Sequence, residues 1–281
     1  MMDAGRHPNI TLLAYSEVEE VSGYVGNFKV KVRRKPRYVI EELCTGCGAC
    51  VEACVWKERV PSEFEAGMGK RNAIYIPFAQ AIPLKAIVDA QSCLFLAREG
   101  RCKQKCAQVC ERNAIDFEQK EEFVELDVGT IIVATGFQMF DAAELSEYSY
   151  GESPNIIDGL QFERLSSATG PTGSEILTAE GEVPERVAII HCVGSRDERA
   201  NRYCSRVCCM YAMKHAHLVR DKTGAEVYEF YMDIRAFGKG YEEFYERVQD
   251  EGVFFVRGRG AEVVVEPDGK LTVKAEDANL G

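Results

Sequence analysis

The sequence predicts an α/β fold joined to a small metal-bound α+β module. Two observations support this prediction: eight of the twelve cysteines lie between residues 40 and 118, and a strand–helix–strand–helix–strand pattern follows residue 187. A cysteine-rich stretch with few long apolar periods is typical of a module that metal, rather than a large core, holds together. Short apolar strands that alternate with helices predict a parallel sheet with right-handed crossovers.

The sequence pattern divides the chain of 281 residues into four segments. The first contains short alternating runs broken by glycines, which predict strands; its basic run, 29–37, is expected to form one solvated strand face. The third begins with a predicted buried strand over 123–136 and continues as irregular connections rich in Gly and Pro. The four segments are 1–39, a β segment; 40–118, an inserted cysteine module; 119–186, connections; and 187–281, an α/β domain.

Helices and strands alternate in the last of these segments. Strands are expected over 187–194, 225–232 and 253–258, because each is a short apolar run. The residues between them suit helices over 203–221 and 241–252. The tail, AEVVVEPDGKLTVKAED, predicts a hairpin with a Pro-Asp-Gly turn.

Composition excludes several classes of protein. The net charge is −11 and the isoelectric point is about 5.1, which argues against a nucleic-acid partner, because phosphate binding favours a basic face. No apolar stretch approaches the ~20 residues that a bilayer helix needs, so no transmembrane segment is expected. The N-terminus lacks the apolar core of a signal peptide. A cytoplasmic location is therefore expected, where thiols stay reduced and cysteines serve as metal ligands or redox groups.

The most specific motif is C-x2-C-x2-C-x3-C, formed by Cys44, Cys47, Cys50 and Cys54. Three thiolates on one tight loop can ligate three irons of a cubane cluster, while a helical turn carries the fourth cysteine to another cluster. The glycines between the cysteines let this loop bend. The alternatives are a zinc knuckle or buried thiols, but zinc sites usually use two separated pairs of ligands.

A second group of cysteines has the wider spacings x8, x3 and x3. Two-cluster ferredoxins exchange their fourth ligands. By this rule one cluster is held by Cys44, Cys47, Cys50 and Cys110, and the other by Cys93, Cys102, Cys106 and Cys54. Val55 and Glu111 stand where proline usually follows the fourth cysteine. The alternative is a damaged second site, with one cluster only.

A third group comprises Cys192, Cys204, Cys208 and Cys209. Cys192 ends a predicted strand, and the other three lie at the predicted start of a helix, where free N–H groups stabilise thiolates and anionic clusters. A third cubane is therefore predicted here. Because adjacent residues point to different sides of a helix, it is open whether Cys208 and Cys209 are both ligands. The alternative is thiols buried as small hydrophobic groups.

The histidines lack paired metal-ligand spacing, so we expect structural or surface roles for them: His7, His191, His215 and His217. No nucleophile pattern of the Ser-His-Asp or Cys-His type is present. No catalytic side chain is therefore predicted, because bound cofactors would carry out the redox chemistry.

A short flavin-like motif, Val133-Ala134-Thr135-Gly136, follows a predicted strand. Small residues there allow the backbone to approach a dinucleotide closely. A complete flavin or nicotinamide site also needs G-x-G-x-x-G after a strand, and the sequence has none. The run Cys192-Val193-Gly194-Ser195-Arg196 stands where a second such fingerprint would lie. We therefore expect the pyridine nucleotide site to be absent or converted to cluster binding.

These motifs resemble those of the A-type subunits of heterodisulfide reductase, the flavin and iron–sulfur subunits of such complexes. The resemblance covers nearly all of the sequence. Flavin subunits of membrane-associated complexes in sulfate reducers share parts of it. The segments that carry the resemblance to heterodisulfide reductase are GRHPNITLLAYSEVEEVSGYVGNFKVKVRRKPRYV, the cysteine run from Cys44, GKRNAIYIPFAQAIPLKA, IIVATGF, HCVGSRDE, YCSRVCCMYAMK and FYMDIRAFGKGYEEFYERV.

The resemblance implies a thioredoxin-reductase-like FAD/NAD-type domain, here partial, with an inserted two-cluster ferredoxin-like domain. It implies [4Fe–4S] clusters and FAD, in complexes where the flavin splits an electron pair between a disulfide and ferredoxin. By motif, Ala134, Thr135 and Gly136 would lie against FAD, and Lys214 would place a cation near its ring system. The third cysteine group would hold a cluster near the flavin.

Family members begin with the FAD glycine fingerprint, and many end with another ferredoxin module. The sequence resembles an internal section that starts just before the ferredoxin insertion, so FAD is expected to bind only with the N-terminal region. The partners implied are B- and C-type subunits, a hydrogenase or dehydrogenase as electron donor, and ferredoxin; the resemblance leaves a homodimer open.

The function implied is that of an oxidoreductase subunit that passes electrons between FAD, [4Fe–4S] clusters and partner subunits. One alternative is a ferredoxin-like relay that is not an enzyme and binds no flavin by itself. A second is the flavin subunit of a membrane-associated redox complex of sulfate reducers. A zinc-bound structural module is a third.

Overall fold

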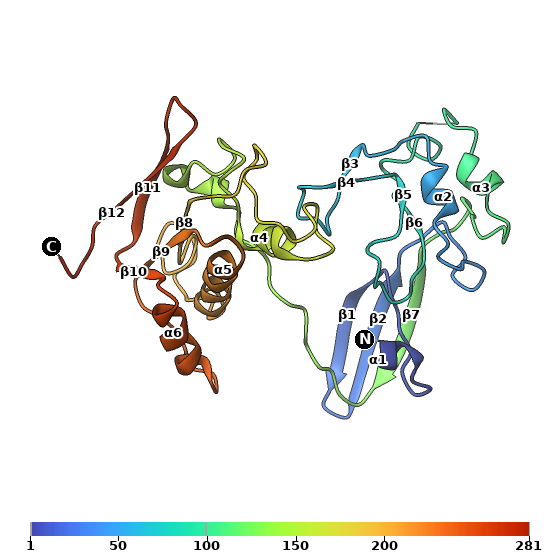
Figure 1. The fold of residues 1–281 in the computed structure, drawn as a ribbon. Helices are drawn as coiled ribbons and strands as arrows, with labels where there is room; N and C mark the ends of the chain where they lie inside the picture. Colours follow the sequence, from blue (N-terminus) through green and yellow to red (C-terminus); the bar gives the residue numbers. More distant parts are fainter. Residues whose placement is uncertain (1, 99, 281) are drawn as a thin grey trace. The chain divides into compact units, whose positions relative to one another are not determined.

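The computed structural model describes residues 2–98 and 100–280. The chain forms two compact units, residues 1–136 and 137–281, and the boundary between them falls within the segment 119–186 that the sequence sets apart (Figure 1). Each unit contains both helices and strands. This confirms the mixed α/β class, whereas the thioredoxin-reductase-like flavin domain stays a prediction.

A three-stranded antiparallel sheet forms part of the first unit. Its strands are β1 (Ser16–Tyr24), β2 (Asn27–Arg34) and β7 (Glu122–Val128), in the order β1-β2-β7. A short helix, α1 (Met2–Arg6), precedes them. The alternation in the sequence sets the pattern of burial: Val30 and Val32 of β2 are buried while its basic side chains face outward.

The basic side chains of β2 meet acidic side chains on both neighbouring strands. Lys29 pairs with Asp127 on β7 at 3.1 Å, and Arg33 pairs with Glu17 on β1 at 2.6 Å. Solvent screens ion pairs as exposed as these, so they contribute little to stability. The prediction of one solvated, charged strand face is therefore confirmed for the part of the run in β2, whereas Arg37, beyond the strand, is buried.

The cysteine module is inserted between β2 and β7, which pair directly with each other. An antiparallel bridge between Val39 and Ile115 closes the base of the module, beside a hydrogen bond from the Ile40 N–H to the Ala114 carbonyl oxygen at 2.7 Å. Its elements are short: α2 (Ala49–Glu52), β3 (Val60–Pro61), β4 (Lys70–Arg71), β5 (Ile74–Tyr75), β6 (Ile87–Val88) and α3 (Lys105–Gln108).

The hydrophobic core of this module is small, and cysteines make up much of the layer that packs against it. Val39, Ile74, Val88 and Ala114 are buried, and most of the cysteines pack against them. So small an apolar core gives limited stabilisation, which suits a module that gains its remaining stability from bound metal.

The strand predicted over 123–136 is wrong in its second half. β7 ends at Val128, and the stretch that follows has no strand. Ile132 and Val133 are 88% and 79% exposed. A strand continues only where another strand accepts its backbone hydrogen bonds, and in the described residues none lies beside this stretch.

The second unit contains the predicted parallel sheet. Its strands are β8 (Arg186–Ile190), β9 (Glu226–Tyr231) and β10 (Phe254–Arg257), in the order β10-β9-β8. The crossovers contain α5 (Cys208–Thr223) and α6 (Tyr241–Asp250). The predicted order of strands and helices is confirmed.

The predicted start of the first crossover helix is wrong. The helix begins at Cys208 rather than near Tyr203. Arg206 has a φ of 65°, in the left-handed region, and a right-handed helix cannot pass through such a residue. Cys204 therefore lies in the loop before the helix, and Cys208 and Cys209 occupy its first turn.

The remaining elements of the second unit precede β8 or follow β10 in the chain. The irregular connection contains two 3₁₀ turns, η1 (Ala142–Glu144) and η2 (Ser146–Tyr148), and the helix α4 (Gly159–Ser166), whose N-terminus is capped by Asp158. The predicted C-terminal hairpin is confirmed as β11 (Gly260–Val265) and β12 (Leu271–Ala275).

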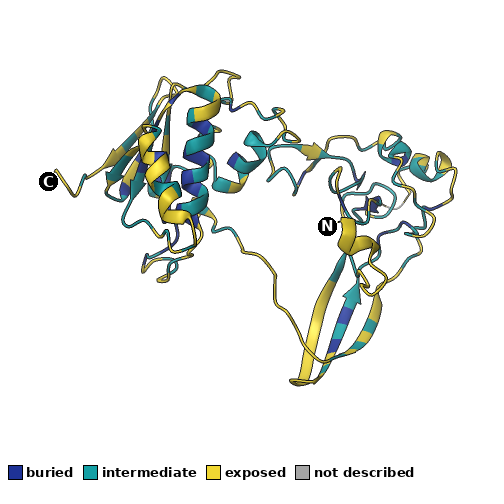
Figure 2. Ribbon diagram, turned by 60° about the horizontal axis from the view of Figure 1, so that its bottom comes forward, coloured by how far each residue is buried: buried dark blue, intermediate teal, exposed yellow. Residues whose placement is uncertain are grey.

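The buried face of α5 fixes the position of this helix against the sheet. Met213 and Val219 of α5 are fully buried together with Val227 of β9 and Val248 of α6. Figure 2 shows which parts of the ribbon are buried. Because these side chains form one core, the first turn of α5 is held near the end of β8. None of the helices in the described residues has the length and apolarity to cross a bilayer.

Candidate iron–sulfur sites

The first set of thiols surrounds Cys50. The loop before α2 carries Cys44 and Cys47, and Cys110 follows α3. Burial raises the pKa of the Cys50 thiol to about 11, and the neighbouring thiols of Cys44, Cys110 and Cys47 add to this effect. The structure therefore brings Cys110 to the three cysteines of the first loop.

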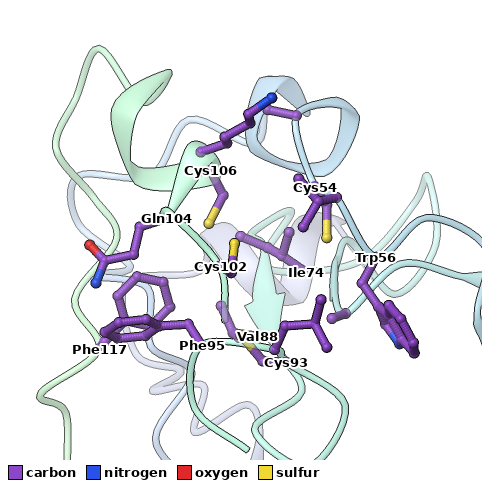
Figure 3. A pocket seen from close by; sticks show the side chains of 15 residues that line it. Cys54, Trp56, Ile74, Val88, Cys93, Phe95, Cys102, Gln104, Cys106 and Phe117 are labelled. Carbon is purple, nitrogen blue, oxygen red and sulfur yellow. The ribbon is translucent and has the colours of Figure 1, made fainter. Parts of the chain in front are cut away.

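The second set surrounds Cys106 on α3. Burial raises the pKa of this thiol to about 12, and its thiol neighbours are Cys93, Cys102 and Cys54. Cys54 follows α2 and so comes from the first cysteine run. Figure 3 shows the sulfur atoms of Cys54, Cys102 and Cys106 facing a common space. The two sets have the composition that exchange of the fourth ligands requires.

Both sets have the chemistry that a cubane cluster needs. Each offers four thiols, and the thiolate, not the thiol, binds iron. Raised pKa values keep Cys50 and Cys106 protonated at neutral pH without metal, so metal binding would release these protons. The backbone N–H of Ala114 donates to the Cys110 sulfur at 3.3 Å, as N–H groups do to cluster sulfur. Cluster binding itself stays a prediction at this point.

An apolar cavity lies beside the second set. Its wall includes Trp56, Phe95 and Phe117, together with Ile74 and Val88 (Figure 3). Apolar walls exclude water, and solvent exposure is one of the factors that set the potential of a cluster. The first set has a more polar neighbour, because the Lys85 ammonium donates to the Cys44 carbonyl oxygen at 2.5 Å.

The third group lies where β8 ends and α5 begins. Cys192, Cys208 and Cys209 are buried together, and Cys192 has a φ of 61°. The Cys209 thiol donates to the Asp233 carbonyl oxygen at 3.6 Å. Interactions among the three thiols lower the pKa of Cys208 and raise the pKa values of Cys192 and Cys209. The first turn of α5 thus places both adjacent cysteines on one site, despite their consecutive positions.

Cys204 lies at the edge of this group. Its sulfur accepts the backbone N–H of Arg206 at 3.4 Å and influences the Cys209 thiol electrostatically. The Arg196 guanidinium, which pairs with Asp233 at 2.8 Å, lies near the sulfur atoms of Cys192 and Cys204. A nearby cation stabilises thiolates and would favour an anionic cluster.

Sequence reasoning missed His191. It is buried, and one of its ring nitrogens, the Cys208 sulfur and the Cys209 sulfur all lie within 4.8 Å of one another. Its side chain pairs with Glu229 of β9. A charged residue inside the apolar run of β9 was the sequence feature that could have revealed this pair.

Two other histidines are structural, as predicted. His215 lies 4.5 Å from the Phe162 ring, centroid to centroid, and burial lowers its pKa to about 4. His217 hydrogen-bonds Glu251 at 2.7 Å.

The residues predicted to contact flavin lie in different units. Ala134, Thr135 and Gly136 are exposed, and a Cβ atom at Gly136 would meet open space. The Lys214 ammonium forms an ion pair with Glu163. Contact of these residues with FAD stays a prediction.

Comparison with known proteins agrees with the cysteine chemistry. The family described as "4Fe-4S binding domain" matches residues 37–54, which include the first cysteine run. The whole chain is 54% identical to the A-type subunit of the "H(2):CoB-CoM heterodisulfide,ferredoxin reductase" of Methanothermobacter marburgensis, over 42% of that protein. Along its full length, the chain is similar to the A-type subunits of heterodisulfide reductase.

Other A-type subunits give the same result. The iron–sulfur A-type subunit of the "CoB--CoM heterodisulfide reductase" of Methanocaldococcus jannaschii is 48% identical, again over the whole chain and 42% of the relative. The A-type subunit of the "Ferredoxin:CoB-CoM heterodisulfide reductase" of Methanosarcina mazei is 43% identical over 99% of the chain and 34% of the relative. The chain thus spans less than half the length of these relatives.

Proposed function

We propose that the chain is an iron–sulfur electron-transfer part of a heterodisulfide-reductase-type oxidoreductase. The observation that carries this proposal is the convergence of two sets of four thiols in one small module, with Cys110 and Cys54 exchanged between them. Similarity to A-type subunits over the whole chain supports the kind of complex. When bound, the clusters supply one-electron oxidation and reduction.

The chain's own residues bind and insulate these clusters. The thiolates of the first set would hold one cubane in residues 44–110 and those of the second set another. The third would be held by Cys192, Cys204, Cys208 and Cys209, near Arg196. Apolar side chains such as Trp56 and Phe95 would keep water from the second cluster.

The partners follow from the names of the relatives. These names mention H₂, the CoB–CoM heterodisulfide and ferredoxin. We therefore infer that electrons reach or leave the clusters through a hydrogenase or dehydrogenase, ferredoxin, and B- and C-type subunits.

The proposal has two forms, which differ in whether the chain binds FAD by itself. The exposed Ala134-Thr135-Gly136 motif and the Lys214–Glu163 ion pair favour a chain that holds clusters but no flavin by itself. In this case, flavin binding needs additional polypeptide, and the chain alone is a ferredoxin-like relay.

Metal and flavin content test this proposal. We expect anoxically purified protein to be brown, to contain about twelve irons and as much acid-labile sulfide per chain, and to lack stoichiometric FAD. About eight irons would remove the third cluster from the proposal. Colourless protein without sulfide or a paramagnetic signal on reduction would contradict the proposal as a whole.

A further inference from the structure

A fully buried polar pair lies beside the third cysteine group. The side chains of His191, at the end of β8, and Glu229, in β9, are both 0% exposed, and Nε2 of His191 lies 2.8 Å from Oε2 of Glu229. The backbone continues the sheet here, because the His191 N–H donates to the Phe230 carbonyl oxygen at 3.0 Å. Neighbouring strands therefore fix both side chains.

The second ring nitrogen of His191 has no protein partner. Nδ1 of His191 is buried without a hydrogen bond to any described residue, and so is Oε1 of Glu229. Buried polar groups are nearly always paired, so an orphaned ring nitrogen indicates a missing partner. Because Nε2 is occupied by Glu229, Nδ1 is the nitrogen that remains for this partner.

The missing partner lies on the side of the cysteines. A ring nitrogen of His191, the Cys208 sulfur and the Cys209 sulfur lie within 4.8 Å of one another, and all three residues are buried. Sulfur in a thiolate or a cluster accepts hydrogen bonds, and such bonds tune the reduction potential.

We propose that His191 donates a hydrogen bond from Nδ1–H to the sulfur of the third cluster site, and that Glu229 holds the ring in place through Nε2. His191 is thus a positioning residue that raises the potential of this cluster, because the bond stabilises the more negative, reduced state. The inference rests on the proposed third cluster, which the four cysteines ligate. The proposal requires a hydrogen on Nδ1, while Nε2 faces Oε2 of Glu229.

The test removes the pair without leaving a buried charge. His191→Leu combined with Glu229→Met replaces both groups by apolar side chains of similar size, a change that buried pairs often tolerate. In full-length, anoxically purified protein, we expect this variant to keep about twelve irons. The EPR signal of the third cluster, identified as the signal missing from Cys209→Ser, should titrate at a lower potential than in wild type.

A second variant restores the donor. His191→Asn combined with Glu229→Gln carries an amide N–H near the position of Nδ1, so the potential should return towards that of wild type. The matched control is His217→Leu, which removes the pair between His217 of α5 and Glu251; it should leave the potential unchanged.

Three outcomes would overturn the inference. A potential unchanged in the apolar double variant would mean that the pair only packs. The loss of about four irons from that variant, with the folded structure kept, would make His191 a ligand instead. Wild-type protein with about eight irons would remove the third cluster, and with it both this inference and that part of the proposed function.

Discussion

The backbone of Gly46 lies against the carbonyl oxygen of Leu84, so that a Cβ atom at Gly46 would lie 2.4 Å from that oxygen. Gly46 stands between Cys44 and Cys47 and has a φ of 72°. The first cluster loop is thus fitted closely to a distant part of the module, and glycine is required there for space as well as for its conformation.

The substitution Gly46→Ala is expected to remove the first cluster. The new methyl group forces the loop away from Leu84, so the thiolates of this loop no longer converge. Iron content should fall by about four per chain. Gly48→Ala is the matched control: Gly48 has a φ of 82°, but a Cβ atom there would meet nothing within 4 Å. It should cost about 1–2 kcal/mol of stability and keep its iron. Equal iron loss in both variants would contradict this explanation.

Paired serine substitutions test the exchange of ligands between clusters. Because Cys50 and Cys110 belong to one set, Cys50→Ser with Cys110→Ser should cost about four irons, no more than either change alone. Because Cys106 belongs to the other set, Cys106→Ser with Cys110→Ser should cost about eight. Unexchanged ligands would reverse the two results. Iron and sulfide analysis distinguishes these patterns.

Metal-free protein should lose stability in alkali. The folded state raises the pKa of Cys50 from 9.0 to about 11 and that of Cys106 from 9.0 to about 12. The unfolded chain therefore releases these protons first, and the free energy of unfolding should fall as the pH rises from about 9 through 12. Urea unfolding of apo-protein at a series of pH values measures this slope. In the Cys50→Ala, Cys106→Ala double variant the slope should be shallower; an identical slope would assign it to other groups.

The substitution Met213→Ala should destabilise the second unit. Met213 is fully buried in the core between α5 and the parallel sheet, so its truncation leaves a cavity that costs about 2–5 kcal/mol. The same change should loosen the first turn of α5 and lower occupancy of the third site. Chemical unfolding monitored with the iron content checks both effects. Gln249→Ala, an exposed change on α6, should shift stability by less than about 0.5 kcal/mol.

Local patterns in the sequence were sufficient for most of the elements. The alternation in β2 and in β9 reflects which side chains are buried, because burial repeats with the period of a strand. The spacing of Cys44, Cys47, Cys50 and Cys54 likewise indicated cluster ligands, because a single loop must present three thiolates to one cubane.

The sequence pattern gave the wrong element where secondary structure depended on contacts with distant parts of the chain. The strand predicted over 123–136 ends at Val128, because a strand continues only where another strand accepts its backbone hydrogen bonds. The sequence pattern likewise did not specify which groups would surround Ala134, Thr135 and Gly136. The left-handed residue Arg206, which delays α5 until Cys208, follows no local pattern either.

The sequence by itself determined the metal chemistry and the order of helices and strands, since both depend on residue types at short spacing. The rule of exchanged fourth ligands also predicted that Cys110 joins Cys50 and that Cys54 joins Cys106. Only the tertiary structure decided that His191 meets Glu229 beside Cys208. This contact arises because neighbouring strands align, and no spacing along the chain specifies it.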